Sequence, residues 1–111
     1  LEKQKLYNLI DSNSLKNTIL ISGDRHAGAI YKDTTLSGKN IYELTSSSLN
    51  LPGGAWASRY KKRPPEPGPK RIDELYVWEN YGLIEFIKDN TVILSLKDIK
   101  GKNINQVQLN Y

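Results

Sequence analysis

The feature that most constrains this chain is a short apolar run that ends directly in a polar cluster. Residues 18–22 read Thr-Ile-Leu-Ile-Ser, and residues 23–26 read Gly-Asp-Arg-His. An apolar, β-branched run without polar alternation predicts a strand that is covered on both faces. The preceding segment, residues 1–11, has Leu6, Leu9 and Ile10 at helical spacing. A polar cluster that follows a helix and a buried strand stands where α/β folds place their ligand chemistry, at the strand's C-terminal end.

Most of the remaining regular structure is predicted to be β. Four segments have the apolar pattern of strands: residues 27–31, 40–46, 82–87 and 91–96. Gly38 marks a turn between the first two, and Lys-Asp-Asn joins the last two as in a β-hairpin. Gly101 marks another turn, and Val107 and Leu109 indicate a short last strand.

Residues 49–78 differ in character from the rest of the chain. They contain Pro-Gly-Gly and the run Pro-Pro-Glu-Pro-Gly-Pro, with few apolar residues to anchor them. We therefore predict a long surface excursion. The same stretch carries the basic excess of the chain, which has a net charge of +4. From Arg59 to Arg71 the local charge is +5 and the remaining residues sum to −1, so the basicity belongs to one loop.

The basic loop has two interpretations. Arg59, Lys61, Lys62 and Arg63 could attract an anionic substrate, and the Trp and Tyr residues that flank the loop could stack on nucleic-acid bases. A solvated loop that its prolines keep extended explains the same pattern. We favour the solvated loop and do not expect nucleic acid as a partner.

The composition limits the class of protein. Cysteine is absent, which excludes disulfides and thiolate metal sites from these 111 residues. No apolar stretch reaches the roughly 20 residues of a membrane span. The sequence begins with Leu1 and contains no Met, so we expect it to be part of a longer chain.

Asp24 and His26 are the candidate metal ligands. In an extended backbone, side chains two residues apart point to the same side, so both could face one point beyond the strand. A carboxylate and a neutral imidazole suit zinc, iron or manganese. Gly23 would let the backbone turn sharply without a Cβ clash. Two ligands are too few for a catalytic metal, so other residues must complete the site.

Three blocks of the sequence, residues 19–26, 42–49 and 80–86, fall in an order that resembles the C-terminal region of alkaline phosphatase D-like enzymes. These enzymes belong to the calcineurin-like metallophosphoesterase superfamily. The resemblance implies that residues 1–111 are the C-terminal segment of a single metallophosphoesterase domain. The expected architecture is the C-terminal portion of a four-layer αββα sandwich, with one N-terminal helix, mostly β-strands and the long Pro-rich loop.

The resemblance also implies a chemistry. Asp24 stands where the wider superfamily has a histidine, and it would bind one metal while His26 binds the other. Iron and calcium are the expected metals, with zinc, manganese or magnesium as alternatives. The intact enzyme would hydrolyse a phosphate monoester, or alternatively a diester, by attack of a metal-bound hydroxide. The other ligands would lie in an N-terminal part of the same domain, so this segment alone is expected to be inactive. The resemblance is compatible with an exported, periplasmic or extracellular enzyme, but the residues themselves do not indicate a compartment.

Two further residues are weaker candidates for the site. Arg25, between the two ligands, is expected to point away from them and to contact a carboxylate or carbonyl, which favours a structural role. Asn80 could hydrogen-bond the loop that carries Asp24, or it could be an ordinary turn residue before Gly82. The rival from another class is a non-catalytic, basic, β-rich module that binds anions or nucleic acid.

Overall fold

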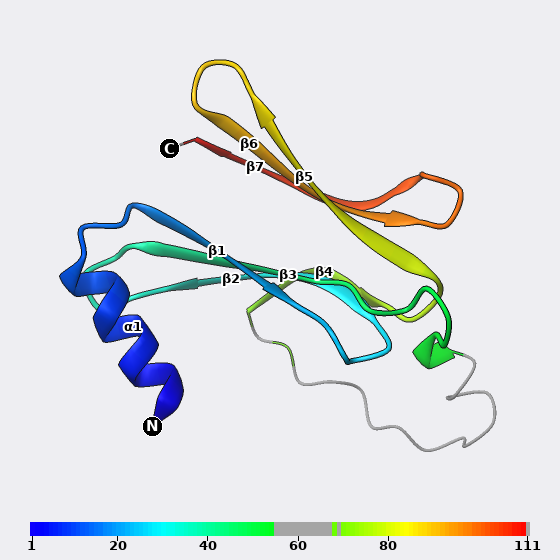
Figure 1. The fold of residues 1–111 in the computed structure, drawn as a ribbon, viewed down its shortest axis with the longest axis horizontal. Coiled ribbons are helices and arrows are strands. Elements are labelled where there is room, and N and C mark those ends of the chain that lie inside the picture. The colour runs from blue at the N-terminus through cyan, green and yellow to red at the C-terminus, as the bar shows by residue number, and fades with distance from the viewer. Residues whose placement is uncertain (55–67, 69, 111) are drawn as a thin grey trace.

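The computed structural model describes residues 1–54, 68 and 70–110 (Figure 1). A single N-terminal helix precedes two β-sheets in this part of the chain. The elements in chain order are α1 (Glu2–Ser12), β1 (Asn17–Ser22), β2 (Gly28–Thr34), β3 (Asn40–Thr45), β4 (Arg71–Tyr76), β5 (Asn80–Ile87), β6 (Thr91–Asp98) and β7 (Asn103–Asn110).

The first sheet has the strand order β1-β3-β2-β4. β1 and β3 are parallel, whereas β2 is antiparallel to both β3 and β4. The turn between β2 and β3 uses Gly38, whose φ of 84° lies in the left-handed region that glycine adopts without cost. The predicted strands on either side of Gly38 are therefore confirmed. The sheet is therefore mixed: β1 and β3 are parallel, and β2, which lies between them along the chain, is antiparallel to β3.

The second sheet is an antiparallel meander, β5-β6-β7. Asp89 and Asn90, with φ of 63° and 58°, form the tight turn between β5 and β6. Ile87 pairs with Thr91, so the loop has three residues, and Asp and Asn tolerate positive φ best after glycine. The predicted hairpin is confirmed. β7 extends from Asn103 to Asn110 and is longer than the short last strand that the sequence indicated.

The hydrophobic core lies between the two sheets. Ile30, Tyr42 and Leu44 of the first sheet pack with Val92, Leu94, Leu96 and Leu109 of the second. Period-two alternation explains this arrangement, because every second residue of β3 and β6 points into the same layer. Asn105 on β7 donates from its Nδ2 to the backbone oxygen of Ile72 on β4 at 2.7 Å, which joins the two sheets on one side.

The prediction of a four-layer αββα sandwich is wrong for the described residues. They form three layers, with α1 on one face of the first sheet and the second sheet on the other (Figure 1). Most of the described chain is strand, and α1 is the one substantial helix in it. The sequence-based expectation took the overall α/β class from the resemblance, but the parallel pairing that is typical of α/β folds is limited to β1 and β3.

The C-terminal half of α1 carries its one buried residue and contacts the first sheet through Lys39. Ile10 is its one buried residue, while Leu9 is 59% exposed. The Lys39 ammonium donates to the carbonyl oxygens of Ile10 and Asp11, at 3.2 and 2.6 Å. These carbonyls belong to the last turn of the helix, where the helix dipole favours a positive charge. Only part of the apolar stripe of α1 is therefore buried against the sheet.

The segment predicted as a surface excursion, residues 49–78, contains more structure than expected. β4 (Arg71–Tyr76) pairs with β2 inside it, and Pro52, Gly53 and Gly54 are buried. The pairing with β2 is interrupted by a register shift, and Asp73 of β4 has a left-handed φ of 58°. Such irregularity breaks the period-two pattern, which is why the sequence did not indicate a strand here.

No helix of the described residues is long and apolar enough to cross a membrane.

Candidate functional site

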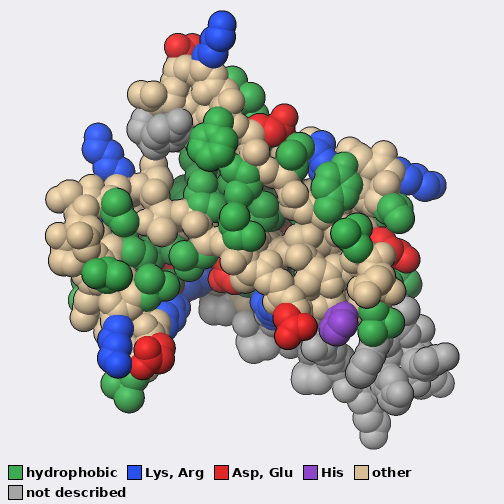
Figure 2. All heavy atoms as spheres, in the orientation of Figure 1, with side chains coloured by type: hydrophobic (Ala, Val, Ile, Leu, Met, Phe, Trp, Pro, Cys, Tyr) green, Lys and Arg blue, Asp and Glu red, His purple; other side chains and the backbone are tan. Residues whose placement is uncertain are grey.

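The candidate ligands lie on the loop between β1 and β2, at the C-terminal end of the parallel pair β1–β3. Asp24 is exposed and His26 is half-buried. Figure 2 shows the chain's single histidine, drawn in purple, at the molecular surface. The carboxyl ends of parallel strands are the usual place for ligands in sheets of this kind. The loop is therefore accessible and lies where the sequence pattern predicted it.

The backbone of this loop is not extended. Asp24 has a φ of 62° and His26 a φ of 54°, so both are in the left-handed region. The period-two argument for their side chains does not apply to such a backbone. Gly23 does not make the turn: a Cβ at this position would meet the Cβ of Ser47 at 3.6 Å, which is ordinary contact. Asp and His adopt positive φ more readily than most residues, which explains why the turn needs no glycine.

The segment that follows β3 runs along this loop and is hydrogen-bonded to it at several points. The amide of Ser46 donates to the carbonyl oxygen of Ser22 at 3.2 Å. The amide of Arg25 donates to the Oγ of Ser47 at 2.8 Å. Gly53 donates from its amide to the carbonyl oxygen of His26 at 2.6 Å. The loop is thus held from one side by residues 46–53.

The imidazole of His26 is oriented by the same segment. Its Nδ1 lies 2.8 Å from the backbone oxygen of Leu51. A carbonyl oxygen can only accept, so Nδ1 carries the proton and the neutral ring has its lone pair on Nε2. A hydrogen bond of this kind to a backbone carbonyl is the arrangement that orients metal-binding histidines in proteins.

Among the described residues, Arg25 and Asn80 have the following side-chain partners. Arg25 donates from Nη1 to the hydroxyl of Tyr31 at 2.9 Å, and its guanidinium lies 5.9 Å from the centre of that ring. Asn80 is fully buried and does not contact the Asp24 loop through its side-chain hydrogen bonds. Its Oδ1 accepts from the Oγ of Ser46 at 2.9 Å, and its Nδ2 donates to the Trp78 carbonyl at 2.7 Å.

The described residues do not contain a complete metal site. Within residues 1–54, 68 and 70–110, no group of three or more His, Cys, Asp or Glu side chains could hold a metal ion. Asp24 and His26 can contribute a carboxylate and an imidazole, the donor types that suit iron and zinc. The basic residues predicted to attract anions, Arg59, Lys61, Lys62 and Arg63, lie outside the described residues.

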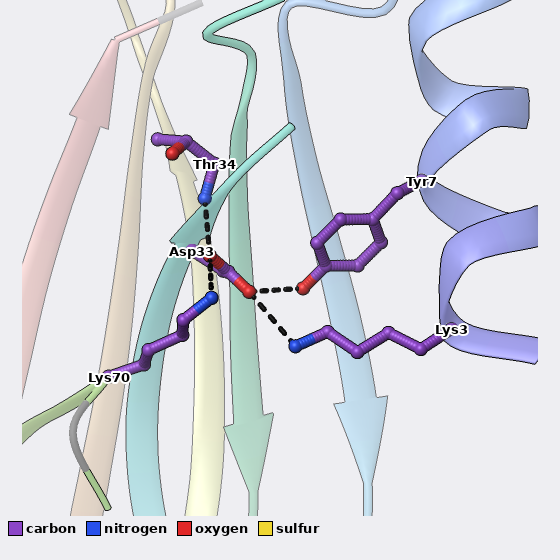
Figure 3. Close-up of polar contacts among 5 residues, drawn as sticks. All are labelled: Lys3, Tyr7, Asp33, Thr34 and Lys70. Carbon is purple, nitrogen blue, oxygen red and sulfur yellow. Dashed lines mark hydrogen bonds and ion pairs between the residues drawn. The ribbon is translucent and has the colours of Figure 1, made fainter. Parts of the chain in front are cut away.

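A second polar cluster lies beneath α1, and sequence reasoning missed it. The carboxylate of Asp33 on β2 accepts from the hydroxyl of Tyr7 at 2.6 Å and is paired with Lys3 at 3.1 Å (Figure 3). The ammonium of Lys70 and the amide of Thr34 also donate to it. The cluster borders a cavity of about 290 Å³ between α1 and the first sheet. The spacing of these residues in the sequence gave no signal, because the contacts depend on how α1 packs.

The charges of this cluster are strongly coupled. Burial disfavours the ionised form of Asp33, but the hydrogen bonds from Lys70 and Tyr7 outweigh it, and the pKa of Asp33 falls well below its usual range. Burial and the neighbouring Asp33 carboxylate raise the pKa of Tyr7 well above its usual range. Asp33 is therefore an anion and Tyr7 a hydrogen-bond donor at neutral pH. These roles fix the position of α1 and give no indication of catalysis.

Comparison of the chain with models of protein families, with curated proteins and with solved structures found no match. The functional interpretation therefore depends on the residues of the loop and on the geometry that surrounds them.

Proposed function

We propose that this chain is part of a metal-dependent phosphoesterase of the alkaline phosphatase D type, with Asp24 and His26 as metal ligands. The orientation of His26 is the observation that carries the proposal. Its Nδ1 is fixed on the Leu51 carbonyl, so Nε2 is the ligating nitrogen. This arrangement leaves the lone pair of the neutral ring on Nε2, where a metal ion would bind.

The position of the loop supports the same proposal. It follows β1 directly, and β1 is the edge strand of its sheet, next to its parallel neighbour β3. A bound cation at this end would be reached from solvent, because Asp24 is exposed. Carboxylate and imidazole donors together accept iron, zinc or manganese, and a carboxylate also suits calcium. Paired metal ions would supply an activated water and would neutralise charge on the phosphate ester.

Between β1 and β5, the layer between the two sheets is exposed, and we call this the open side of the molecule. It supports the proposal that another part of the same domain completes the site. Ile21 on β1 shares its face with Ile19, which packs on the core, yet Ile21 is 76% exposed. Phe86 on β5 shares its face with core-packed Ile84 and is 73% exposed. Apolar side chains gather on this face between the sheets (Figure 2). These residues point into the layer between the sheets but have nothing to cover them among the described residues.

The proposal is tested by substituting each ligand in the intact enzyme. Asp24→Asn and His26→Asn keep a residue that tolerates a left-handed backbone, so loss of the ligand is separated from loss of the turn. Each is expected to reduce metal content and phosphate-ester hydrolysis by at least about a hundredfold, since removal of a direct ligand costs more than the 10- to 100-fold loss typical of its supporting residues. Bound metal and hydrolysis of a chromogenic phosphate monoester and diester are measured.

Asp89→Asn is the matched control, because Asp89 is also an exposed aspartate with a φ of 63° but lies on the distant β5–β6 turn. It should leave metal content and turnover unchanged. Unaltered metal content in both loop variants would overturn the proposal. The 111-residue chain by itself is expected to show no metal-dependent hydrolysis, and turnover by it would contradict the incomplete site.

A further inference from the structure

The loop that carries Asp24 and His26 needs support from outside itself. Left-handed φ angles at non-glycine residues are unfavourable by about 1 kcal/mol each, and this loop has two of them separated by one residue. The residue between them, Arg25, donates its backbone amide to the Oγ of Ser47 at 2.8 Å. The Ser47 hydroxyl therefore bonds the centre of the turn that separates the two candidate ligands.

Ser46, the neighbour of Ser47, is tied to the second sheet. Its Oγ donates to the Oδ1 of Asn80 at 2.9 Å, and its amide donates to the Ser22 carbonyl at the end of β1. Ser46 and Ser47, which we name the serine pair, thus connect β5 to the candidate ligand loop. Both serines follow the last residue of β3 directly, and both are half-buried.

Asn80 is held firmly enough to act as the fixed end of this connection. It is fully buried, and its Nδ2 donates to the Trp78 carbonyl at 2.7 Å. Gly28, two residues after His26, lies directly against it: a Cβ on Gly28 would be 2.6 Å from the Asn80 Oδ1. The amide of Asn80 thus packs on the start of β2 and is hydrogen-bonded to the residue before Ser47.

We propose that Asn80, acting through the serine pair, is a positioning residue that fixes the left-handed turn of the Asp24–His26 loop and the orientation of the His26 ring. The second sheet, which carries neither candidate ligand, thereby controls the geometry of the candidate metal site. The positioning of the loop stands on the contacts above, and only its consequence for metal binding rests on the proposed function.

The chain's single histidine makes the test direct, because every imidazole signal in a spectrum of the 111-residue chain comes from His26. Nitrogen-15 NMR of the neutral ring reports which nitrogen carries the proton. The wild-type chain should show the Nδ1-protonated tautomer. Ser47→Ala and Asn80→Ala should shift the ring toward the Nε2-protonated tautomer and shift the amide resonances of residues 24–26. Ser47→Thr, which keeps the hydroxyl, should restore the wild-type spectrum.

Asn105→Ala is the matched control for Asn80→Ala. Asn105 is also buried and also donates to a backbone carbonyl between the sheets, that of Ile72 at 2.7 Å, but it lies on β7 away from the loop. It should lower the unfolding midpoint as Asn80→Ala does, yet leave the His26 ring unchanged. Should Asn80→Ala fail to fold, Ser47→Ala carries the test, since it removes one half-buried hydroxyl.

A His26 spectrum that is the same in the wild type, Ser47→Ala and Asn105→Ala would overturn the positioning role. In the intact enzyme, Ser47→Ala is expected to weaken metal binding by about 10- to 100-fold, the usual cost of losing a supporting contact. If Ser47→Ala changes the ring tautomer while the wild-type enzyme binds no metal, the positioning role holds and the phosphoesterase proposal fails.

Discussion

Asp33 shows how one ionised residue can fix a helix that buries little apolar surface. α1 buries only Ile10, so hydrophobic packing contributes little to its attachment. The Asp33 carboxylate accepts a hydrogen bond from Tyr7 and forms an ion pair with Lys3, both of which lie on α1. It forms a second ion pair with Lys70, in the segment before β4 (Figure 3). The side chain of Asp33 is 13% exposed, whereas that of Lys3 is 64% exposed. Solvent therefore screens the lysine contacts more than the Tyr7 hydrogen bond.

Asp33→Asn is expected to lower the free energy of unfolding by about 1 to 2 kcal/mol near neutral pH, after discounting the exposed lysine pairs. Because the folded-state pKa of Asp33 is lowered, its contribution is present above the unfolded pKa of about 3.9 and is lost as the pH falls below it. Urea unfolding at about pH 7 and about pH 3 measures this. The difference between wild type and Asp33→Asn should shrink at the lower pH, and an equal difference at both would contradict it.

At the residue scale, the sequence predicted which side chains are chemically notable but not their conformation. Asp24 and His26 stand out because of their types and their place after an apolar strand. Their left-handed φ angles and the Leu51 contact arise from residues 46–53, which are distant in sequence. Local pattern cannot contain that information, since the turn is selected by tertiary hydrogen bonds. The Asp33 cluster was missed for the same reason.

At the scale of elements, the start of β2 lies very close to β5 and β6. A Cβ at Gly28 would lie 2.6 Å from both the Asn80 Oδ1 and the Leu96 Cδ1. β2 thus approaches β5 and β6 more closely here than any residue with a side chain would permit. This approach joins the two sheets just behind the candidate ligand loop.

Gly28→Ala is expected to destabilise the chain by about 1 to 3 kcal/mol, because the added methyl overlaps two buried groups that cannot move aside freely. Gly23→Ala is the matched control, since its Cβ would make only ordinary contacts at 3.6 and 3.7 Å and its φ is not left-handed. Denaturant unfolding of both variants measures the effect. Equal stability of the two variants would show that β2 can shift away from Asn80.

Elements with regular apolar spacing were predictable, and irregular ones were not. The helix follows period 3.6, β1 is a continuous apolar run, and the strands around Gly38 and of the β5–β6 hairpin have the apolar pattern of strands. β4 was missed because Asp73 interrupts its alternation, and it lies next to a Pro-rich stretch that suggested a loop. The layering was mispredicted because strand pattern does not specify which sheet packs on which. The resemblance implied a four-layer sandwich, and the described residues do not form one.

At the scale of the whole molecule, the core is closed on one side and open on the other. The Asn105–Ile72 hydrogen bond joins β7 to β4, the two edge strands on the closed side. On the open side, β1 has no charged residue between Asn17 and Ser22, although exposed edge strands usually carry charges that prevent pairing. Together with exposed Ile21 and Phe86, this pattern is typical of a surface that other residues cover.

If another part of the proposed enzyme covers the open side, thiols introduced at positions 21 and 86 should react quickly only in the 111-residue chain. The chain has no cysteine, so Ile21→Cys and Phe86→Cys each place one thiol at a known point. Both should react quickly with a maleimide in the 111-residue chain. In the intact enzyme, with any other cysteines replaced, both should react at least about tenfold more slowly, because burial limits access to local opening.

Ile99→Cys, at a position 65% exposed on the β6–β7 turn, is the control and should react alike in both. Equal rates for all three thiols in the intact enzyme would mean that the open side is a true outer surface, and the proposed completion of the domain at β1 and β5 would be wrong.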